Sequence, residues 1–155
     1  MTSTTDLHHF LRTRRSVRRF KPDPVPASVI QDILHIATFA PSAHNRQPWR
    51  FCVVTTSVLK QKLADAMSVE FQRDLETDGL PPEEINKRTT RSRERITSAP
   101  VVILLCLDMT EMDAYPDKKR RRAEFRMAMQ SVAGAGLQLL LAAHAEGLGG
   151  VWVCS

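Results

Sequence analysis

A polar stretch at residues 40–49, APSAHNRQPW, carries side chains that suit a planar ligand. Pro41 and Pro48 stop regular structure near its two ends. Between them stand hydroxyl and amide groups that donate and accept hydrogen bonds. These groups belong to Ser42, Asn45 and Gln47. The same pattern is typical of an ordinary surface loop with a buried Trp49 anchor, so local chemistry leaves both readings open.

A second candidate site is a cationic cluster at residues 12–21, in which six of ten side chains are Arg or Lys. Arg14, Ser16 and Arg18 offer guanidinium forks and a hydroxyl to an anion or to a carbonyl-rich ring edge. In an extended chain these three share one face, and Arg15 lies on the other. A solvated basic segment and a nucleic-acid contact are the alternatives. No recognition-helix, RNA-binding or zinc pattern accompanies the cluster.

The other side chains give little support to hydrolysis or metal catalysis. No histidine has a second ligand at i,i+4, and no paired carboxylates stand out. The chain lacks G-x-S-x-G, a P-loop, and G-x-G-x-x-G between a strand and a helix. The GLGG run at 147–150 follows a predicted helix, which reverses the order of the dinucleotide fingerprint. The inventory therefore favours a site that holds a cofactor, with the cofactor supplying the chemistry, and no metal site is predicted.

The expected helices and strands place these residues at the ends of regular elements. Apolar spacing predicts a helix that ends near Phe39, and the β-branched run at 51–55 predicts a strand. A continuous apolar strand at 100–107 is expected to be buried on both faces of a central sheet. The remaining expected elements are helices at about 5–14 and from Ser57, a long helix at about 123–146, and a strand from 148.

Two segments have a composition that sets them apart. Residues 68–98 are rich in charge and poor in apolar side chains, which predicts an exposed helical excursion, either a lid or a partner-facing flap. The helix at 123–146 is apolar almost all round between Met127 and Ala143, which indicates burial in the core or across a subunit interface. Gly134 and Gly136 lower its helix propensity and would let another helix approach closely.

Size and composition predict one soluble domain. The chain has 155 residues, of which 43% are hydrophobic and 25% charged, as in globular proteins. A formal net charge of +5 favours an anionic partner such as a phosphate-bearing cofactor or a nucleic acid. Cys52, Cys106 and Cys154 lack C-x-x-C spacing, and two of them fall in predicted buried strands. With no apolar signal segment and no run long enough for a bilayer, we expect a reduced, cytoplasmic protein.

Three separated segments together resemble the FMN-dependent nitroreductase family. They are residues 14–20, 40–49 and 147–153, and the resemblance covers essentially the whole chain. It implies an α+β fold, a mixed sandwich whose mostly antiparallel central sheet is flanked by helices. It also implies an intertwined homodimer with two FMN sites at the subunit interface, in which the long apolar helix forms the dimer core.

The resemblance also implies which residues bind FMN. The first segment would hold the phosphate, ribityl chain and pyrimidine edge, the middle segment would reach the flavin of the other subunit, and the last would lie along the isoalloxazine ring. The implied residues are Arg14, Arg15, Ser16 and Arg18, then Pro41, Ser42, Ala43, Asn45 and Gln47, and finally Trp152, Val153 and Cys154.

Family members continue for several tens of residues past the segment matching 151–153, and that tail supplies a further strand, contacts with the partner and basic residues on the FMN phosphate. The expectation is thus a single FMN-binding domain over residues 1–155 without that tail. Residues 120–127, RRRAEFRM, are similar to the nitroreductase-like domain attached to deazaflavin-coenzyme ligases.

The predicted function is ping-pong hydride transfer from NAD(P)H through FMN to a planar electron-poor acceptor, such as a nitroaromatic, a quinone or an enamide-like substrate. No side chain is assigned as catalytic acid, because in this family the proton can come from solvent. The expected partners are a second copy of the chain and a small-molecule acceptor, not nucleic acid or membrane. Reduction of a deazaflavin coenzyme precursor is one alternative, and separately a deazaflavin could replace NAD(P)H as the hydride donor. A non-enzymatic flavin carrier or a basic nucleic-acid-binding protein is the other.

Overall fold

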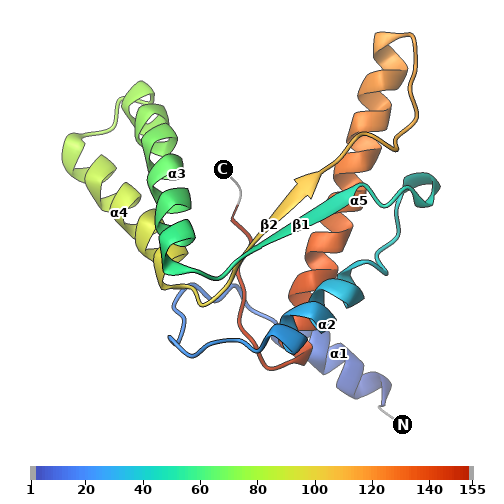
Figure 1. Ribbon diagram of the computed structural model, residues 1–155, viewed down its shortest axis with the longest axis horizontal. Coiled ribbons are helices and arrows are strands. Elements are labelled where there is room, and N and C mark those ends of the chain that lie inside the picture. The colour runs from blue at the N-terminus through green and yellow to red at the C-terminus, as the bar shows by residue number, and fades with distance from the viewer. Residues whose placement is uncertain (1–2, 154–155) are drawn as a thin grey trace. The chain divides into compact units, whose positions relative to one another are not determined.

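The computed structural model describes residues 3–153, which form α-helices, one 3₁₀ turn and one short strand pair (Figure 1). The sequence places a cap at the start of several helices: the Ser3, Thr56 and Asp117 side chains each accept a backbone N–H of the first turn. In chain order the elements are α1 (Thr4–Thr13), α2 (Ala27–Ala37), the 3₁₀ turn η1 (Ala43–Asn45), β1 (Trp49–Val54), α3 (Ser57–Thr77), α4 (Pro82–Ser98), β2 (Val102–Leu107) and α5 (Lys118–Ala145).

The chain divides into two compact units. The first comprises Met1–Val17, Pro26–Cys52 and Leu104–Trp152, and the second comprises Arg18–Val25, Val53–Ile103 and Val153–Ser155. The predicted candidate segments lie mainly in the first unit. Within the described residues, no helix is long and apolar enough to cross a membrane.

The first unit is built on α5, against which α2 packs (Figure 1). Two small side chains of α5, Ala128 and Ala135, are completely buried. Ala40 and Trp49 meet Ala135 in a buried cluster, around which Phe51, Leu105 and Val132 pack. The predicted Trp49 anchor is thus confirmed, since this side chain is only 4% exposed.

The second unit contains the helical hairpin of α3 and α4 (Figure 1). Gly79 follows α3 in a left-handed conformation with φ of 73°, a backbone geometry that glycine adopts at little cost. Pro82 then begins α4, and the Nζ of the buried Lys60 donates a hydrogen bond of 2.6 Å to the Ala99 carbonyl. The predicted helical excursion is confirmed, but α3 extends to Thr77 where a change at residue 68 was expected.

The strands β1 and β2 pair with each other in antiparallel fashion, because the Asp108 N–H after β2 donates to the Pro48 carbonyl before β1. Helices together with this sheet confirm the predicted α+β class. The predicted burial of β2 on both faces is wrong for the single chain. Its residues are half-buried and Cys106 is exposed, because only β1 pairs with β2 in the described part of the chain. Cys52 is likewise an exposed free thiol.

Two further expectations are corrected. Residues 148–153 do not form the predicted strand; they contribute one isolated parallel bridge, between Ser16 and Gly150. Helix α5 is also not buried all round in the single chain, since Phe125, Met129 and Leu137 are about half-exposed. This exposure does not fit the core alternative for that side of α5 in the single chain; the subunit interface stays a prediction.

Candidate functional site

The first and last predicted segments meet in the first unit. The Val17 N–H donates to the Gly150 carbonyl at 3.0 Å, beside the Ser16–Gly150 bridge. Gly149 packs directly on Val17, and a Cβ added at Gly149 would lie 2.9 Å from the Val17 Cβ. Since carbon atoms normally stay 3.5–4.0 Å apart, this contact requires glycine.

The end of α5 positions both segments. Gly147 has φ of 71° and ends the helix in the left-handed conformation typical of such a cap. His144, in the last turn, stacks on Phe10 with ring centroids 4.9 Å apart. The His144 Nε2 also lies 3.1 Å from the Thr13 hydroxyl. These contacts hold α1, and with it the cationic segment, against the last turn of α5.

A cavity of about 340 Å³ lies where these segments meet, a size within the range of small-molecule sites. Arg14 and Arg15 bring positive charge to it, and Gly147, Gly149 and Gly150 contribute backbone without side chains, next to Leu148. This donor set suits an anionic group attached to a larger ligand. The lining residues are Thr13, Arg14, Arg15, Val17, Leu140, His144, Gly147, Leu148, Gly149 and Gly150.

The middle segment packs on α5 as well. The Ala43 N–H donates to the Ser131 hydroxyl at 3.1 Å, and that hydroxyl donates to the Met127 carbonyl. The Ser42 hydroxyl accepts the Gln47 N–H at 3.1 Å. The half-buried Ser42 is therefore a fixed part of this turn.

An unusual backbone marks the middle segment. His44, Asn45 and Gln47 all have positive φ, near 50°, although none is glycine. Such conformations are uncommon and cluster at ligand-binding and active sites. Sequence reasoning missed this feature; the enrichment of Asn and His in the left-handed region was the available signal.

The structure does not bring the middle segment into the cavity. Ser131, which holds Ala43, and Leu140, which lines the cavity, are nine residues apart on α5. At 1.5 Å per residue, they are about 13.5 Å apart along the helix. The single chain therefore joins the first and last candidate segments and keeps the middle one apart.

The remaining predicted residues have different surroundings. Trp152 is 45% exposed, and its ring packs on Gly136, where an added Cβ would lie 2.9 Å from ring carbons. Asn45 accepts a hydrogen bond of 3.3 Å from the Gln47 side chain, and Pro41 is exposed. Arg18 and Val153 belong to the second unit, and Cys154 lies outside the described residues.

Charged groups border the middle segment. Arg46 pairs with Asp113 at 2.6 Å and Arg50 with Asp108 at 2.9 Å. The Thr110 side chain and backbone hydrogen-bond the Asp108 carboxylate, and with Arg50 they hold its pKa below the ordinary value. These pairs tie the 40–50 segment to the connection that follows β2.

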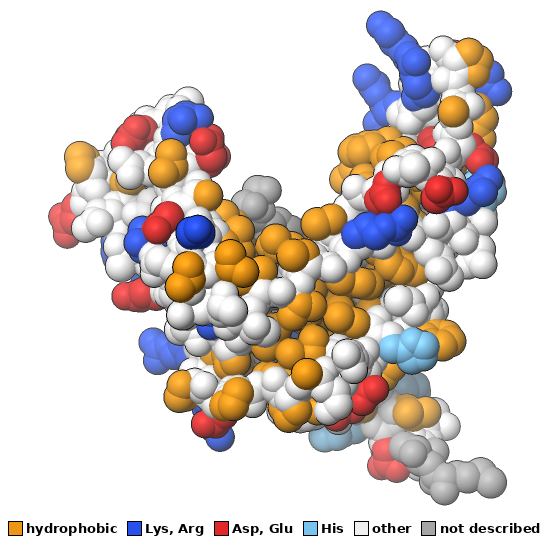
Figure 2. All heavy atoms as spheres, viewed as in Figure 1, with side chains coloured by type: hydrophobic (Ala, Val, Ile, Leu, Met, Phe, Trp, Pro, Cys, Tyr) orange, Lys and Arg blue, Asp and Glu red, His pale blue; other side chains and the backbone are white. Residues whose placement is uncertain are grey.

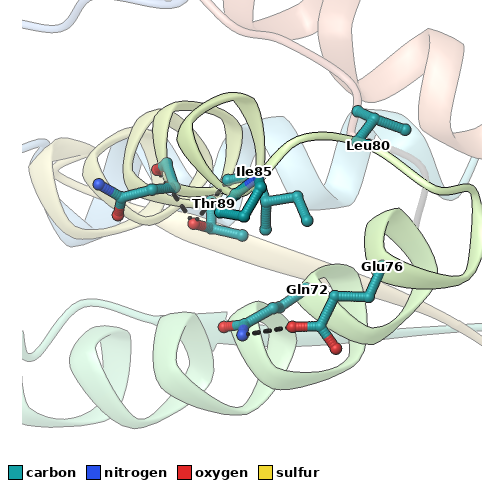
Figure 3. A pocket seen from close by; sticks show the side chains of 7 residues that line it. Gln72, Glu76, Leu80, Ile85 and Thr89 are labelled. Atoms are coloured by element: carbon teal, nitrogen blue, oxygen red, sulfur yellow. Dashed lines mark hydrogen bonds between the residues drawn. The ribbon is translucent and has the colours of Figure 1, made fainter.

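A second cavity of about 350 Å³ lies between α3 and α4 (Figure 3). Its polar side chains bond within their own helices: Gln72 donates to Glu76 at 2.7 Å, and Thr89 donates to the Ile85 carbonyl. No set of polar groups converges on a ligand there. The remaining lining residues are Leu80, Pro82 and Asn86.

Solved structures share this fold. A BluB-like flavoprotein from Clostridium difficile 630 superposes with a TM-score of 0.75 at 26% identity, covering 96% of this chain and 74% of that one. An iodotyrosine deiodinase bound to FMN and 3-iodo-L-tyrosine superposes with a TM-score of 0.72 at 27% identity, with coverage of 96% and 74%.

Sequence relatives agree with the structural likeness. The protein YfhC of Bacillus subtilis, assigned as an NAD(P)H nitroreductase, is 31% identical over 94% of this chain and 68% of its own length. The family model described as "Nitroreductase family" matches residues 11–155. The predicted resemblance is confirmed. The chain belongs to the nitroreductase family.

Proposed function

We propose that this chain is an FMN-dependent oxidoreductase that takes hydride from NAD(P)H and passes it to a planar, electron-poor small molecule. The observation that carries the proposal is the cavity that Arg14 and Arg15 line together with the glycine-rich run at 147–150. Family membership and the FMN-bound deiodinase of the same fold support the choice of cofactor.

The residues of the cavity fit such a group. A guanidinium binds phosphate through two parallel hydrogen bonds, and Arg14 is placed for this role beside the cavity. Arg15 donates to the Arg12 and Arg14 carbonyls, so it fixes the backbone of the segment as well as adding charge. Trp152, two residues beyond the glycine-rich run, does not line the cavity, but at 45% exposed it offers apolar ring surface to a larger ligand. Bound FMN supplies the hydride chemistry, and the chain supplies binding and orientation.

The homodimer is part of this proposal. Phe125, Met129, Ala133 and Leu137 are exposed at four-residue intervals, so they form one apolar stripe along α5. Figure 2 shows hydrophobic side chains on the surface of this helix. A second copy that covers the stripe would remove it from water. It would also let the middle segment of one subunit serve the cavity of the other, which accounts for their separation in one chain.

The exposed thiols of Cys52 and Cys106 suit a reducing compartment, so we place the protein in the cytoplasm. The acceptor belongs to the class of nitroaromatics, quinones or enamide-like compounds, and either NADH or NADPH can be tested as donor.

The experiment measures FMN affinity and NAD(P)H oxidation together. Arg14→Ala should weaken FMN binding by about tenfold to a hundredfold, the equivalent of one charge-assisted hydrogen bond. Arg12→Ala is the matched control, because it removes the same charge from a side chain that does not line the cavity. Equal FMN affinity in the two variants would refute the assignment of Arg14. Failure of the bound flavin to accept hydride from either nucleotide would refute the reaction.

A further inference from the structure

Glu124, near the start of α5, is a buried carboxylate with an unsatisfied oxygen. The residue is only 1% exposed. Its Oε1 accepts the Asp113 N–H at 3.2 Å, but no donor in the described part of the chain reaches Oε2. A buried carboxylate oxygen without a partner is costly, because burial removes the hydrogen bonds that water would make. Something beyond the side chains described here should therefore satisfy Oε2.

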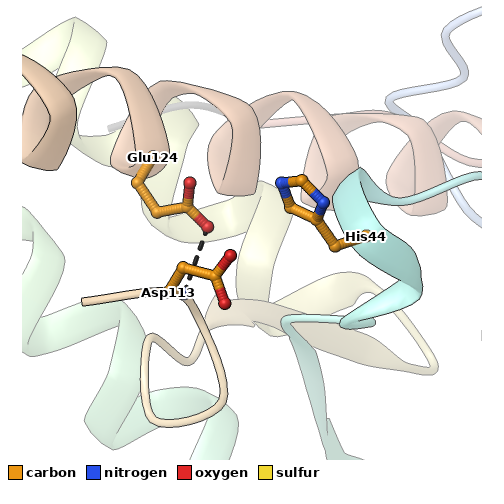
Figure 4. Close-up of side chains that lie close together, drawn as sticks. All are labelled: His44, Asp113 and Glu124. Carbon is orange, nitrogen blue, oxygen red and sulfur yellow. Dashed lines mark hydrogen bonds between the residues drawn. The ribbon is translucent and has the colours of Figure 1, made fainter. Parts of the chain in front are cut away.

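Two other metal-binding side chains converge on Glu124. One ligand atom from each of His44, Asp113 and Glu124 lies within 4.8 Å of the other two. Figure 4 shows the three side chains pointing toward one another from η1, the connection after β2, and α5. Because the three residues are far apart in the sequence, no ligand spacing could reveal them, and the sequence predicted no metal.

We propose that His44, Asp113 and Glu124 form a binding site for a divalent transition-metal ion, with water completing the coordination. One imidazole nitrogen with two carboxylate oxygens is a ligand set suited to ions such as Zn²⁺, whereas Mg²⁺ and Ca²⁺ prefer oxygen alone. Metal–ligand bonds of 2.0–2.2 Å set tetrahedral ligand atoms about 3.4 Å apart. A side-chain adjustment of about 1 Å would therefore close the site.

The charges around the site favour a cation. Arg46 is paired with one oxygen of Asp113 at 2.6 Å, and a carboxylate has a second oxygen for another ligand. Asp113 and the buried Glu124 give the cluster two carboxyl groups, whereas one cation, Arg46, is paired with it, so the cluster has an excess of acidic groups. A divalent ion would compensate it and give Oε2 a partner.

Metal binding would also fix the strained 44–47 turn. His44 has φ of 53°, a conformation that persists only where the surroundings hold it. A bond from its ring to an ion shared with Glu124 would anchor the turn to α5. This inference does not rest on the proposed flavin function, since it concerns only the chain's own side chains.

The test titrates the metal-free full chain with Co²⁺ and follows the d–d absorption bands, with Zn²⁺ competition to confirm the site. We expect one equivalent per chain and no thiolate charge-transfer band, which separates this site from the exposed Cys52 and Cys106. The variant His44→Ala should bind Co²⁺ at least about a hundredfold more weakly. Loss of a residue that only hydrogen-bonds a metal ligand already weakens binding by up to about a hundredfold, and loss of a ligand itself should cost no less. The variant His35→Ala is the control, because it removes another exposed histidine away from the cluster.

Glu124→Gln gives a second test: it keeps the size of the side chain but removes the carboxylate, so we expect Co²⁺ binding to be lost. If this variant fails to fold, His44→Ala still decides, because His44 is exposed and its removal leaves the core intact. Absence of Co²⁺ binding by the unaltered chain would overturn the proposal. So would binding that survives His44→Ala, since the ligands would then lie elsewhere.

Discussion

Replacing Gly149 with alanine tests the contact that joins the first and last candidate segments. The added Cβ would lie 2.9 Å from the Cβ and Cγ2 of Val17 and 3.0 Å from its Cγ1. These distances are at least about 0.5 Å too short for carbon atoms. Valine is stiff at χ1 and its Cβ is fixed to the backbone, so a rotamer change cannot relieve the contact. The two backbones must separate.

This separation of the two backbones lowers the free energy of unfolding of the Gly149→Ala variant. Overpacking of this kind costs about 1–3 kcal/mol, and stretching the 3.0 Å hydrogen bond from Val17 to Gly150 adds about 1 kcal/mol. Gly149 is not in the left-handed region, so alanine brings no backbone strain of its own. The total is a loss of about 2–4 kcal/mol, which lowers the midpoint by about 1–2 M at a urea slope of about 2 kcal/mol per molar.

Tryptophan fluorescence is the appropriate assay, because Trp49 and Trp152 both belong to the first unit. Gly134→Ala is the control: its added Cβ meets only the Pro41 carbonyl, at 3.9 Å. Inside a helix that change should stabilise by about 0.5–1 kcal/mol. An unchanged urea midpoint for Gly149→Ala, or equal shifts for the two variants, would refute the close contact.

Three further predictions concern other parts of the chain. Lys60→Met keeps the buried aliphatic stem but leaves the Ala99 carbonyl without its 2.6 Å hydrogen bond. We expect the free energy of unfolding to fall by about 1–3 kcal/mol, measured by urea unfolding followed by circular dichroism. Hydrogen bonds from Thr110 lower the pKa of Asp108 in the folded chain below 3.8. The Asp108 carboxylate therefore stabilises the fold at pH values above 3.8, and this stabilisation is lost as pH falls through the lower pKa of the folded state. Thr110→Val should therefore reduce the fall of the urea midpoint as pH drops below 3.8; an identical pH profile would contradict this. Met129→Glu should convert the proposed dimer to a monomer in sedimentation, whereas Val69→Glu, at a similarly exposed apolar position on α3, should not. Two dimeric variants would exclude the proposed α5 interface.

Local sequence signals predicted the elements that depend on neighbouring residues. The apolar run at 127–143 predicted the body of α5, but the helix begins at Lys118 rather than near residue 123, because Asp117 caps it and the basic residues 118–122 form its first turns. Gly79 and Pro82 bound the turn between α3 and α4. The contact between the cationic segment and the glycine-rich run was expected only through the family resemblance. Composition does not show that Gly149 must lie against Val17.

The features that sequence did not reveal depend on tertiary contacts. The sequence around Glu124 is typical of a solvated charge at the start of a helix. The side chain is nevertheless buried, and the Asp113 N–H from the connection after β2 donates to it. The left-handed turn at His44 and Asn45 is held by Ser131, which lies 88 positions beyond Ala43. The half-exposure of β2 was missed because a continuous apolar run does not show how many strands or chains will cover it.

The measurement that tests the central claim most directly is the visible absorption spectrum of the purified protein after incubation with FMN and size-exclusion chromatography. We predict a flavin band that elutes with a dimer at one FMN per chain and bleaches when NADH or NADPH is added without oxygen. A protein that elutes without flavin after incubation with excess FMN would contradict the proposed function.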